Sequence, residues 1–214
     1  MSRAGRFDHF RIGAGLVALL LVRAAAFADA PPMQVFHAVT TSMEPTVLKG
    51  EAVLIDTEYY RSHTPSRGDV VTLTAPDKTE RLVRIIGLPG DRVQLRGGRL
   101  FINDQEVPRR QVEDYVYHFE AGLPDETLAQ YVEALPTGAN GGTREHRIVS
   151  AGGGPLNDPT GILNDTKVFA VPPDHYFVLG DNRDHSVDSR TTLGFVPADA
   201  ITGRAMSHAG SDIE

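Results

Sequence analysis

Turn-forming residues interrupt this chain so often that most of it cannot form long helices. Twenty-one glycines and fourteen prolines are distributed over 214 residues, and both residue types favour turns and end regular elements. Between them lie short runs rich in apolar and β-branched residues, such as 52–55, 70–73 and 175–179. With 41% hydrophobic residues, the chain can bury one substantial core. These features predict one main domain of the all-β class.

The clearest local prediction is a hairpin centred on Gly97 and Gly98. Runs 92–95 and 99–102 flank this pair, and two glycines readily adopt the positive φ angles of a tight two-residue turn. A second hairpin tip is expected at Asp77-Lys78. Residues 103–165 are rich in Gly, Pro, Asn and charge, which predicts an inserted cap of irregular strands and loops rather than a second core.

The N-terminal segment has two interpretations. Arginines, the last of them Arg11, precede an apolar run from 12 to 22, and Arg23 and an alanine-rich stretch follow. A basic region, a short apolar core and an Ala-x-Ala end are typical of a cleavable signal peptide. The alternative is an uncleaved anchor over 12–28, close to the shortest length that crosses a bilayer. Both interpretations predict a cytoplasmic N-terminus and an exported remainder.

Composition excludes several classes of function. The chain contains no cysteine, so disulfides, thiolate zinc sites and a cysteine nucleophile are excluded. A net charge of −7 provides no basic surface for nucleic acid. A self-cleaving repressor would need a helix-turn-helix module before its serine, and this chain has an apolar segment there.

Three short motifs, in a fixed order, indicate the chemistry. They are Ser-Met-Glu-Pro-Thr at 42–46, Gly-Leu-Pro-Gly-Asp at 87–91, and Gly-Asp-Asn-Arg-Asp-His-Ser-Val-Asp-Ser-Arg at 180–190. A serine hydroxyl is a weak nucleophile unless a base accepts its proton. With the preceding apolar segment, the motifs resemble bacterial type I signal peptidase, a membrane-anchored serine endopeptidase family that removes signal peptides from exported proteins. The resemblance covers residues 10–206.

The resemblance implies a fold and a set of residue roles. The implied fold consists of coiled antiparallel sheets with one N-terminal transmembrane anchor helix and a small inserted cap. Ser42 matches the nucleophile, Thr40 matches a position whose hydroxyl helps to bind the oxyanion, and Ser186 matches a serine that contacts the base. Thr41 stands where the family usually has glycine. Four further charged residues match positions that hold the third motif near the active site: Asp181, Arg183, Asp188 and Arg190.

The general base of the family is a lysine, and the matching position here holds Val83. In the family pattern this lysine directly precedes the arginine before the second motif, and that arginine is Arg84. No gap separates Val83 from the motif, and a valine cannot accept a proton. Of the histidines, His185 is the leading candidate for a substitute base because it lies inside the third motif. His37 is a weaker candidate.

Nearby cations are poor substitutes for the missing lysine. Arg81 shares a strand face with Val83 by the two-residue alternation of strands, but arginine stays protonated in proteins. Lys78 is expected at the tip of a hairpin, as a solvated surface residue. Apolar residues around Phe36, Val53 and Leu82 match the small-residue pockets that the resemblance implies.

The resemblance also favours the anchor interpretation of the N-terminus. The implied location is the inner membrane, single-pass, with the catalytic domain on the periplasmic side. The implied partners are exported preproteins with Ala-x-Ala cleavage sites, the lipid bilayer and the secretion machinery; no metal, cofactor or nucleic acid is implied. Two hypotheses follow, an active endopeptidase and an impaired homologue that binds signal peptides without cleavage. A third interpretation, a periplasmic binding module with a cleaved leader, leaves the three motifs unexplained. The implied segments are 1–11 cytoplasmic, 12–28 anchor, 29–102 and 166–206 β core, 103–165 cap, and 207–214 tail.

Overall fold

The computed structural model describes residues 32–117, 125–138, 141–150, 163–208 and 211–213. Every regular element in these ranges is a strand or a short 3-10 helix, the helices being η1 (Tyr59–Arg61) and η2 (Ala198–Ala200). The predicted all-β class is therefore confirmed. The expected anchor at 12–28 lies outside the described residues. No helix within the described ranges is long and apolar enough to cross a membrane.

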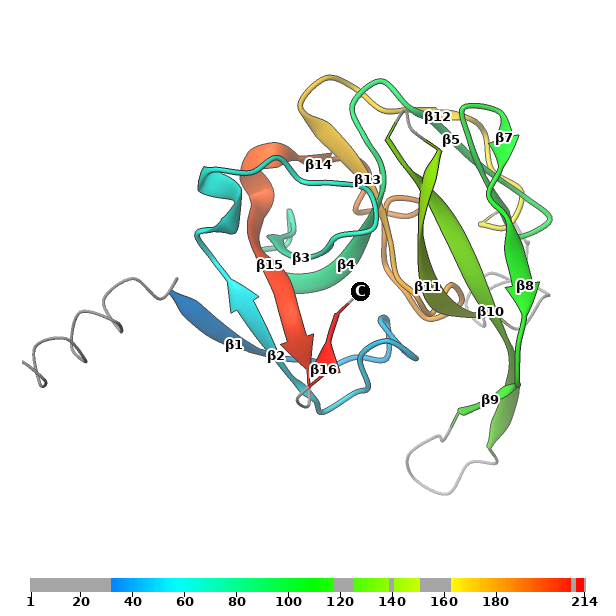
Figure 1. The fold of residues 1–214 in the computed structure, drawn as a ribbon, viewed down its shortest axis with the longest axis horizontal. Coiled ribbons are helices and arrows are strands. Elements are labelled where there is room, and N and C mark those ends of the chain that lie inside the picture. The colour runs from blue at the N-terminus through cyan, green and yellow to red at the C-terminus, as the bar shows by residue number, and fades with distance from the viewer. Residues whose placement is uncertain (1–31, 118–124, 139–140, 151–162, 209–210, 214) are drawn as a thin grey trace, which may run out of the picture. The chain divides into compact units, whose positions relative to one another are not determined.

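The main sheet has eight antiparallel strands (Figure 1). They are β1 (Met33–His37), β2 (Ala52–Asp56), β3 (Val70–Thr74), β4 (Glu80–Gly87), β13 (His175–Leu179), β14 (Val196–Pro197), β15 (Ile201–His208) and β16 (Ser211–Asp212). Their order is β1-β2-β15-β3-β4-β13-β14, with β16 paired to β15. Strand β4, which leads into the second motif, is thus the neighbour of β13, which leads into the third.

The described residues also form two four-stranded sheets. One runs β12-β5-β6-β7 and the other runs β11-β10-β8, with β9 also paired to β10. Their strands are β5 (Arg92–Arg96), β6 (Arg99–Ile102), β7 (Gln105–Glu106), β8 (Arg109–Gln111), β9 (Tyr115–Tyr117), β10 (Glu126–Thr137), β11 (Gly142–Ser150) and β12 (Phe169–Ala170).

Irregular pairing of β15 explains why the main sheet is curled (Figure 1). Its register shifts against β2 between Ala205 and Ser207, and against β3 between Ile201 and Gly203. Such irregularities bend a strand and increase its twist. Gly203 has no room for a side chain, because a Cβ there would lie 2.4 Å from Ile55 Cγ2. The expected coiled antiparallel sheet is therefore observed.

Both predicted hairpin tips are present. Arg96 pairs with Arg99 across Gly97 and Gly98, whose φ angles are 52° and 70°. Two consecutive positive φ angles give the turn whose twist suits a two-residue hairpin. At the other tip, Lys78 has a φ of 67° and its N–H donates to the Ala75 carbonyl at 2.9 Å.

The block 103–165 contains a more regular hairpin than its composition indicates. Strands β10 and β11 pair without a break from Ala129–Ser150 to Thr137–Gly142. The hairpin also packs on the rest of the chain, since Leu135 is fully buried in the apolar cluster that holds residues of β5, β6 and β13. Burial of such a side chain contributes about 1.5–3 kcal/mol. Long-range packing of this kind stabilises a strand pair that local sequence leaves undetermined.

Candidate active site

Ser42 lies in the loop between β1 and β2, and buried neighbours fix this loop to the core. Met43 is 2% exposed and Val47 is fully buried, and the Val47 N–H donates to the Met43 carbonyl at 3.0 Å. Ser42 itself stays partly exposed. Its hydroxyl oxygen lies 3.0 Å from the Thr40 hydroxyl oxygen. The loop therefore presents two hydroxyl groups side by side, and packing against the core holds it in place.

The third motif packs directly against this loop. The Asn182 N–H donates to the Ser42 carbonyl at 3.1 Å. Gly180 lies between the two serines, because a Cβ there would be 2.5 Å from the Ser42 carbonyl oxygen and 2.4 Å from Ser186 Cβ. Only glycine permits such an approach of backbone to backbone. The fold thus brings together Ser42 and Ser186, which are far apart in the sequence.

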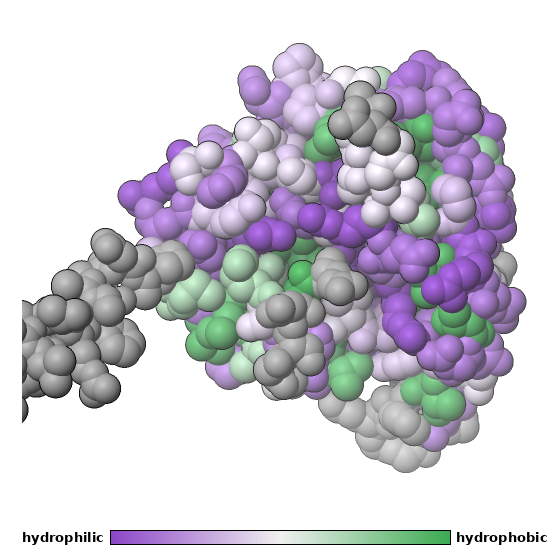
Figure 2. All heavy atoms as spheres, viewed as in Figure 1, coloured by the Kyte–Doolittle hydropathy of each residue, from purple (hydrophilic) through white to green (hydrophobic). Residues whose placement is uncertain are grey.

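A cleft of about 330 Å³ opens beside Ser42, and most of its wall is apolar. Phe36 and Leu82 line it as the resemblance implies, but Val53 is fully buried in the core and does not. Figure 2 shows further apolar surface over β1 and β2. The residues that line the cleft are Phe36, Ala38, Val39, Thr40, Ser42, Met43, Thr79, Glu80, Arg81, Leu82, Val83, His185, Ser186 and Val187.

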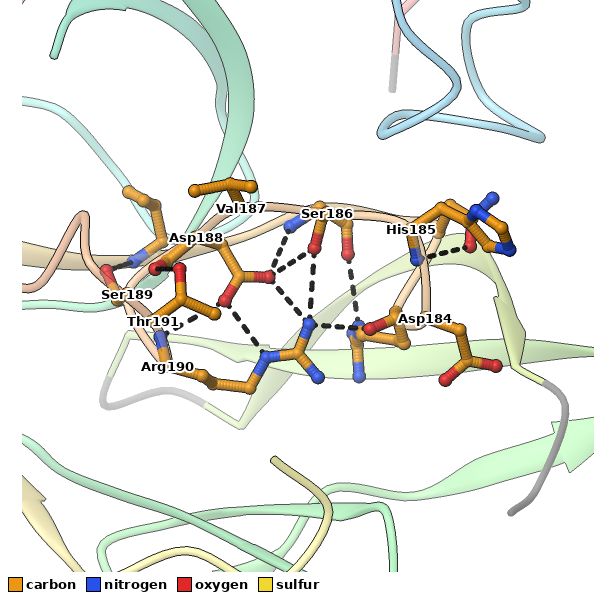
Figure 3. A network of polar contacts seen from close by, with 12 residues as sticks. Asp184, His185, Ser186, Val187, Asp188, Ser189, Arg190 and Thr191 are labelled. Atoms are coloured by element: carbon orange, nitrogen blue, oxygen red, sulfur yellow. Dashed lines mark hydrogen bonds and ion pairs between the residues drawn. The ribbon is translucent and has the colours of Figure 1, made fainter. Parts of the chain in front are cut away.

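The Ser186 hydroxyl is engaged with charged neighbours of its own motif (Figure 3). It donates to Asp188 Oδ2 at 2.5 Å and accepts from Arg190 Nη2 at 3.2 Å. Arg190 Nε in turn donates to Asp188 Oδ1 at 2.9 Å. Burial alone would raise the pKa of Asp188, but the Arg190 charge and its hydrogen bonds outweigh burial and lower it. Asp188 is therefore an anion that orients Ser186.

A second buried ion pair joins the third motif to β4. Arg84 Nε donates to Asp181 Oδ1 at 2.9 Å, and Arg84 Nη2 donates to Asp181 Oδ2 at 2.8 Å. Both side chains are 1% exposed. Burial favours the neutral acid, yet Arg84 holds the pKa of Asp181 below its ordinary value. Two parallel hydrogen bonds between ions fix both orientation and distance, so Arg84 positions the strand that carries Val83.

Strand β10 supplies a partner that sequence reasoning missed. Arg183 Nη1 donates to Glu133 Oε1 at 3.0 Å, and Glu133 is fully buried. His146 on β11 lies beside this pair, with Nε2 3.7 Å from Glu133 Oε2 and 3.9 Å from Asp181 Oδ1. Burial lowers the pKa of His146 to about 4. No linear motif marks these two residues, and only the register of the hairpin brings them to the third motif.

Comparison with known proteins identifies a family. The family model described as "Signal peptidase, peptidase S26" matches residues 11–209. The chain belongs to this family. Signal peptidase I of Rickettsia bellii (strain OSU 85-389) is 38% identical over 146 residues, covering 67% of this chain and 47% of that protein. Signal peptidase I of Rickettsia conorii (strain Malish 7) is 34% identical over 196 residues, covering 81% of this chain and 70% of that protein.

The extent of these matches differs among the relatives. The chain spans about half the length of the Rickettsia bellii protein, 47% of it being covered. A crystal structure of a signal peptidase I from Enterococcus faecalis V583 is 26% identical. The match covers 66% of this chain and 97% of that chain, with a TM-score of 0.36.

Val83, which the sequence resemblance matches to the family's lysine, forms part of the apolar wall of the cleft. It is 3% exposed, pairs in register with Val71 on β3, and lines the same cleft as Ser42. Among the charged residues near it, Arg81 is paired with Asp77 at 2.6 Å. Lys78 is exposed at its turn and does not line the cleft. The cleft thus presents the Ser42 hydroxyl beside an apolar side chain at position 83.

His185 is the histidine that the fold brings to this cleft. Its ring stacks on Tyr117, with centroids 5.1 Å apart and an angle of 22° between planes. Its Nε2 is buried and has no hydrogen-bond partner among the described residues. Figure 3 shows the ring pointing away from the Ser186 hydroxyl. His37, the weaker candidate, is exposed on β1 and does not line the cleft.

Proposed function

We propose that this protein is a serine endopeptidase that removes signal peptides from exported preproteins. The observation that carries the proposal is the Ser42 hydroxyl, which lies 3.0 Å from Thr40 and lines an apolar cleft. Membership of the signal peptidase family supports it. An apolar cleft beside the nucleophile suits the small apolar residues of an Ala-x-Ala site.

The reaction follows from the placement of these groups. Ser42 Oγ attacks the carbonyl carbon of the scissile bond while its proton passes to a base. The Ser42 N–H and the Thr40 hydroxyl stabilise the resulting oxyanion, a contribution worth about 3–4 kcal/mol for one donor. The C–N bond then breaks, and the base returns the proton to the leaving amine. Water hydrolyses the Ser42 ester by the same steps and releases the signal peptide.

The base in this proposal is His185. It lines the cleft that contains Ser42. Its Nε2 is buried without a hydrogen-bond partner among the described residues, so in this proposal the ring turns from its stack on Tyr117 to reach Ser42. Ser186 and its partner Asp188 shape the same loop. Asp181, Arg183 and Arg190 hold this loop by buried ion pairs and hydrogen bonds.

Turnover of an internally quenched Ala-x-Ala peptide by the full-length protein in detergent tests the assignment. Wild type is expected to cleave the peptide and Ser42→Ala is expected to be inactive. His185→Gln removes the base and lowers kcat by about 10²-fold or more, whereas His37→Gln, at an exposed site outside the cleft, is the matched control. Equal turnover of both histidine variants would show that His185 is not the base.

A second candidate function is the binding of signal peptides without cleavage. The observation in its favour is Val83, which leaves the lysine position without a titratable group. This alternative predicts that wild type binds a labelled Ala-x-Ala peptide and releases it intact. Normal turnover of the same peptide excludes it.

The proposal extends to location and partners. Residues 12–28 anchor the chain in the inner membrane with 1–11 in the cytoplasm and the remainder on the periplasmic side. Exposed apolar residues on β1 and β2 support a site close to the bilayer: Met33 (43% exposed), Val35 (49%) and Leu54 (41%). The substrates are exported preproteins with Ala-x-Ala sites, received from the secretion machinery. The division into a β core (29–102 and 166–206), a cap (103–165) and a tail (207–214) belongs to the same proposal.

A further inference from the structure

A second cleft, of about 580 Å³, adjoins the nucleophile loop. The loop contributes residues to both clefts, since Thr40 and Ser42 line the first while Thr41 and Glu44 line the second. The loop is therefore a wall that both clefts share. The residues that line the second cleft are Thr41, Glu44, Leu48, Lys49, Gly50, Tyr115 and Tyr117.

Opposite the nucleophile loop, a stacked pair of rings, His185 and Tyr117, lies between the two clefts. His185 lines the first cleft and Tyr117 lines the second, and their rings stack with centroids 5.1 Å apart. Tyr117 is 9% exposed. The second cleft is consequently built from two segments that are distant in the sequence, the nucleophile loop and β9. The shape of this cleft depends on the contacts that hold β9 against the loop.

A hydrogen bond holds β9 against the nucleophile loop. The Tyr115 hydroxyl donates to Glu44 Oε2 at 3.0 Å, and the Lys49 N–H donates to Glu44 Oε1 at 3.3 Å. Glu44 is 7% exposed. Burial, followed by the charge of Glu44, raises the pKa of Tyr115, so its hydroxyl stays protonated and remains a donor. Tyr115 thus joins the two segments that line the second cleft.

We propose that the second cleft binds the segment of the substrate that follows the scissile bond. This inference rests on the proposed function, because a peptide cut at Ser42 extends to both sides of that residue. The first cleft has a mainly apolar wall, which suits the signal-peptide side. The second has two tyrosines, a carboxylate and a lysine, which suit a polar or aromatic extended peptide. Tyr115 and Tyr117 are then specificity-determining residues for the mature end of the preprotein.

The absence of tryptophan from the chain gives a direct experiment. Two peptides are titrated into full-length Ser42→Ala protein in detergent, one ending at Ala-x-Ala and one continuing for four residues, with tryptophan second after the scissile bond. The longer peptide is expected to bind about tenfold tighter, since one or two such contacts are worth about that factor. Its tryptophan emission is expected to shift to the blue on binding.

The outcomes separate the two proposals. If the two peptides bind equally and the tryptophan emission stays at its unbound wavelength, the inference is wrong although the proposed function stands. If neither peptide binds, the proposed function fails and the inference fails with it. The peptide comparison uses a single protein, so it does not depend on whether any cleft variant folds.

Variants then locate the contact. Tyr115→Phe releases β9 from Glu44, and Tyr117→Leu removes the ring that separates the clefts. Each is expected to lose about fivefold in affinity for the longer peptide and to bind the shorter peptide as before. Tyr131→Phe is the matched control, because Tyr131 lies on β10 against Arg109 and lines neither cleft. Equal effects of all three variants would overturn the assignment.

Discussion

Introducing a lysine at position 83, which the sequence resemblance matches to the family's base, is expected to supply a general base to the cleft. Val83 is 3% exposed and lines the cleft beside Ser42. A lysine stem can replace the valine side chain while its amine extends into the cleft. The change is made in the His185→Gln background, so that the proposed natural base is absent. The Val83→Lys substitution is then expected to restore cleavage.

The size of the effect follows from the surroundings of Val83. An ordinary lysine has a pKa of about 10.4, so less than about 1% of it is neutral at pH 8. Apolar burial lowers a lysine pKa by up to about 3–5 units, and a lowering of about 2 units already makes about a quarter neutral at pH 8. A positioned base contributes about 10²–10⁴-fold. The double variant is therefore expected to exceed His185→Gln by at least about 10²-fold in kcat, with a rise from pH 7 to pH 9.

The assay is cleavage of the quenched Ala-x-Ala peptide across this pH range. Val83→Met in the same background is the matched control, because methionine has a similar stem without an amine. Either substitution overpacks the site at a cost of about 1–3 kcal/mol, so urea unfolding must show that both variants fold. If both fold and bind the peptide but cleave it equally slowly, position 83 does not face the nucleophile and the reasoning is refuted.

Three further predictions concern the groups around the nucleophile. Thr40→Val removes the hydroxyl 3.0 Å from Ser42 Oγ and is expected to lower kcat by about 10²-fold with little change in KM. Asp181→Asn leaves Arg84 buried without its carboxylate and is expected to cost about 3–5 kcal/mol in urea unfolding. Burial lowers the pKa of His146 to about 4, so the unfolded chain takes up its proton first as the pH falls, and stability drops by about 2 kcal/mol from pH 7 to pH 5. His146→Gln is expected to remove that part of the pH dependence, and an unchanged pH dependence would contradict it.

Much of the fold could be predicted from the sequence because it depends on the conformational preferences of individual residues. The Gly97-Gly98 turn was predictable because positive φ angles favour glycine. The short β-branched runs predicted strands for the same local reason. The regular hairpin of β10 and β11 was not predictable, because burial of Leu135 against distant strands stabilises it.

In the candidate site too, some residues are predictable from local sequence and others depend on the fold. Ser42 and Ser186 are found from motifs, since each motif is contiguous in the sequence. Glu133 and His146 are not, because their relation to Arg183 and Asp181 depends on the register of two strands. The second cleft was missed for the same reason, as Tyr115 reaches Glu44 across 71 residues of sequence.

The central claim is that Ser42 cleaves the peptide bond after a signal sequence. Its most direct test is mass spectrometry of a purified preprotein incubated with the full-length protein in liposomes. The account predicts a new N-terminus directly after the Ala-x-Ala site, present with wild type and absent with Ser42→Ala. An intact preprotein with both proteins, or the same product with both, would contradict it.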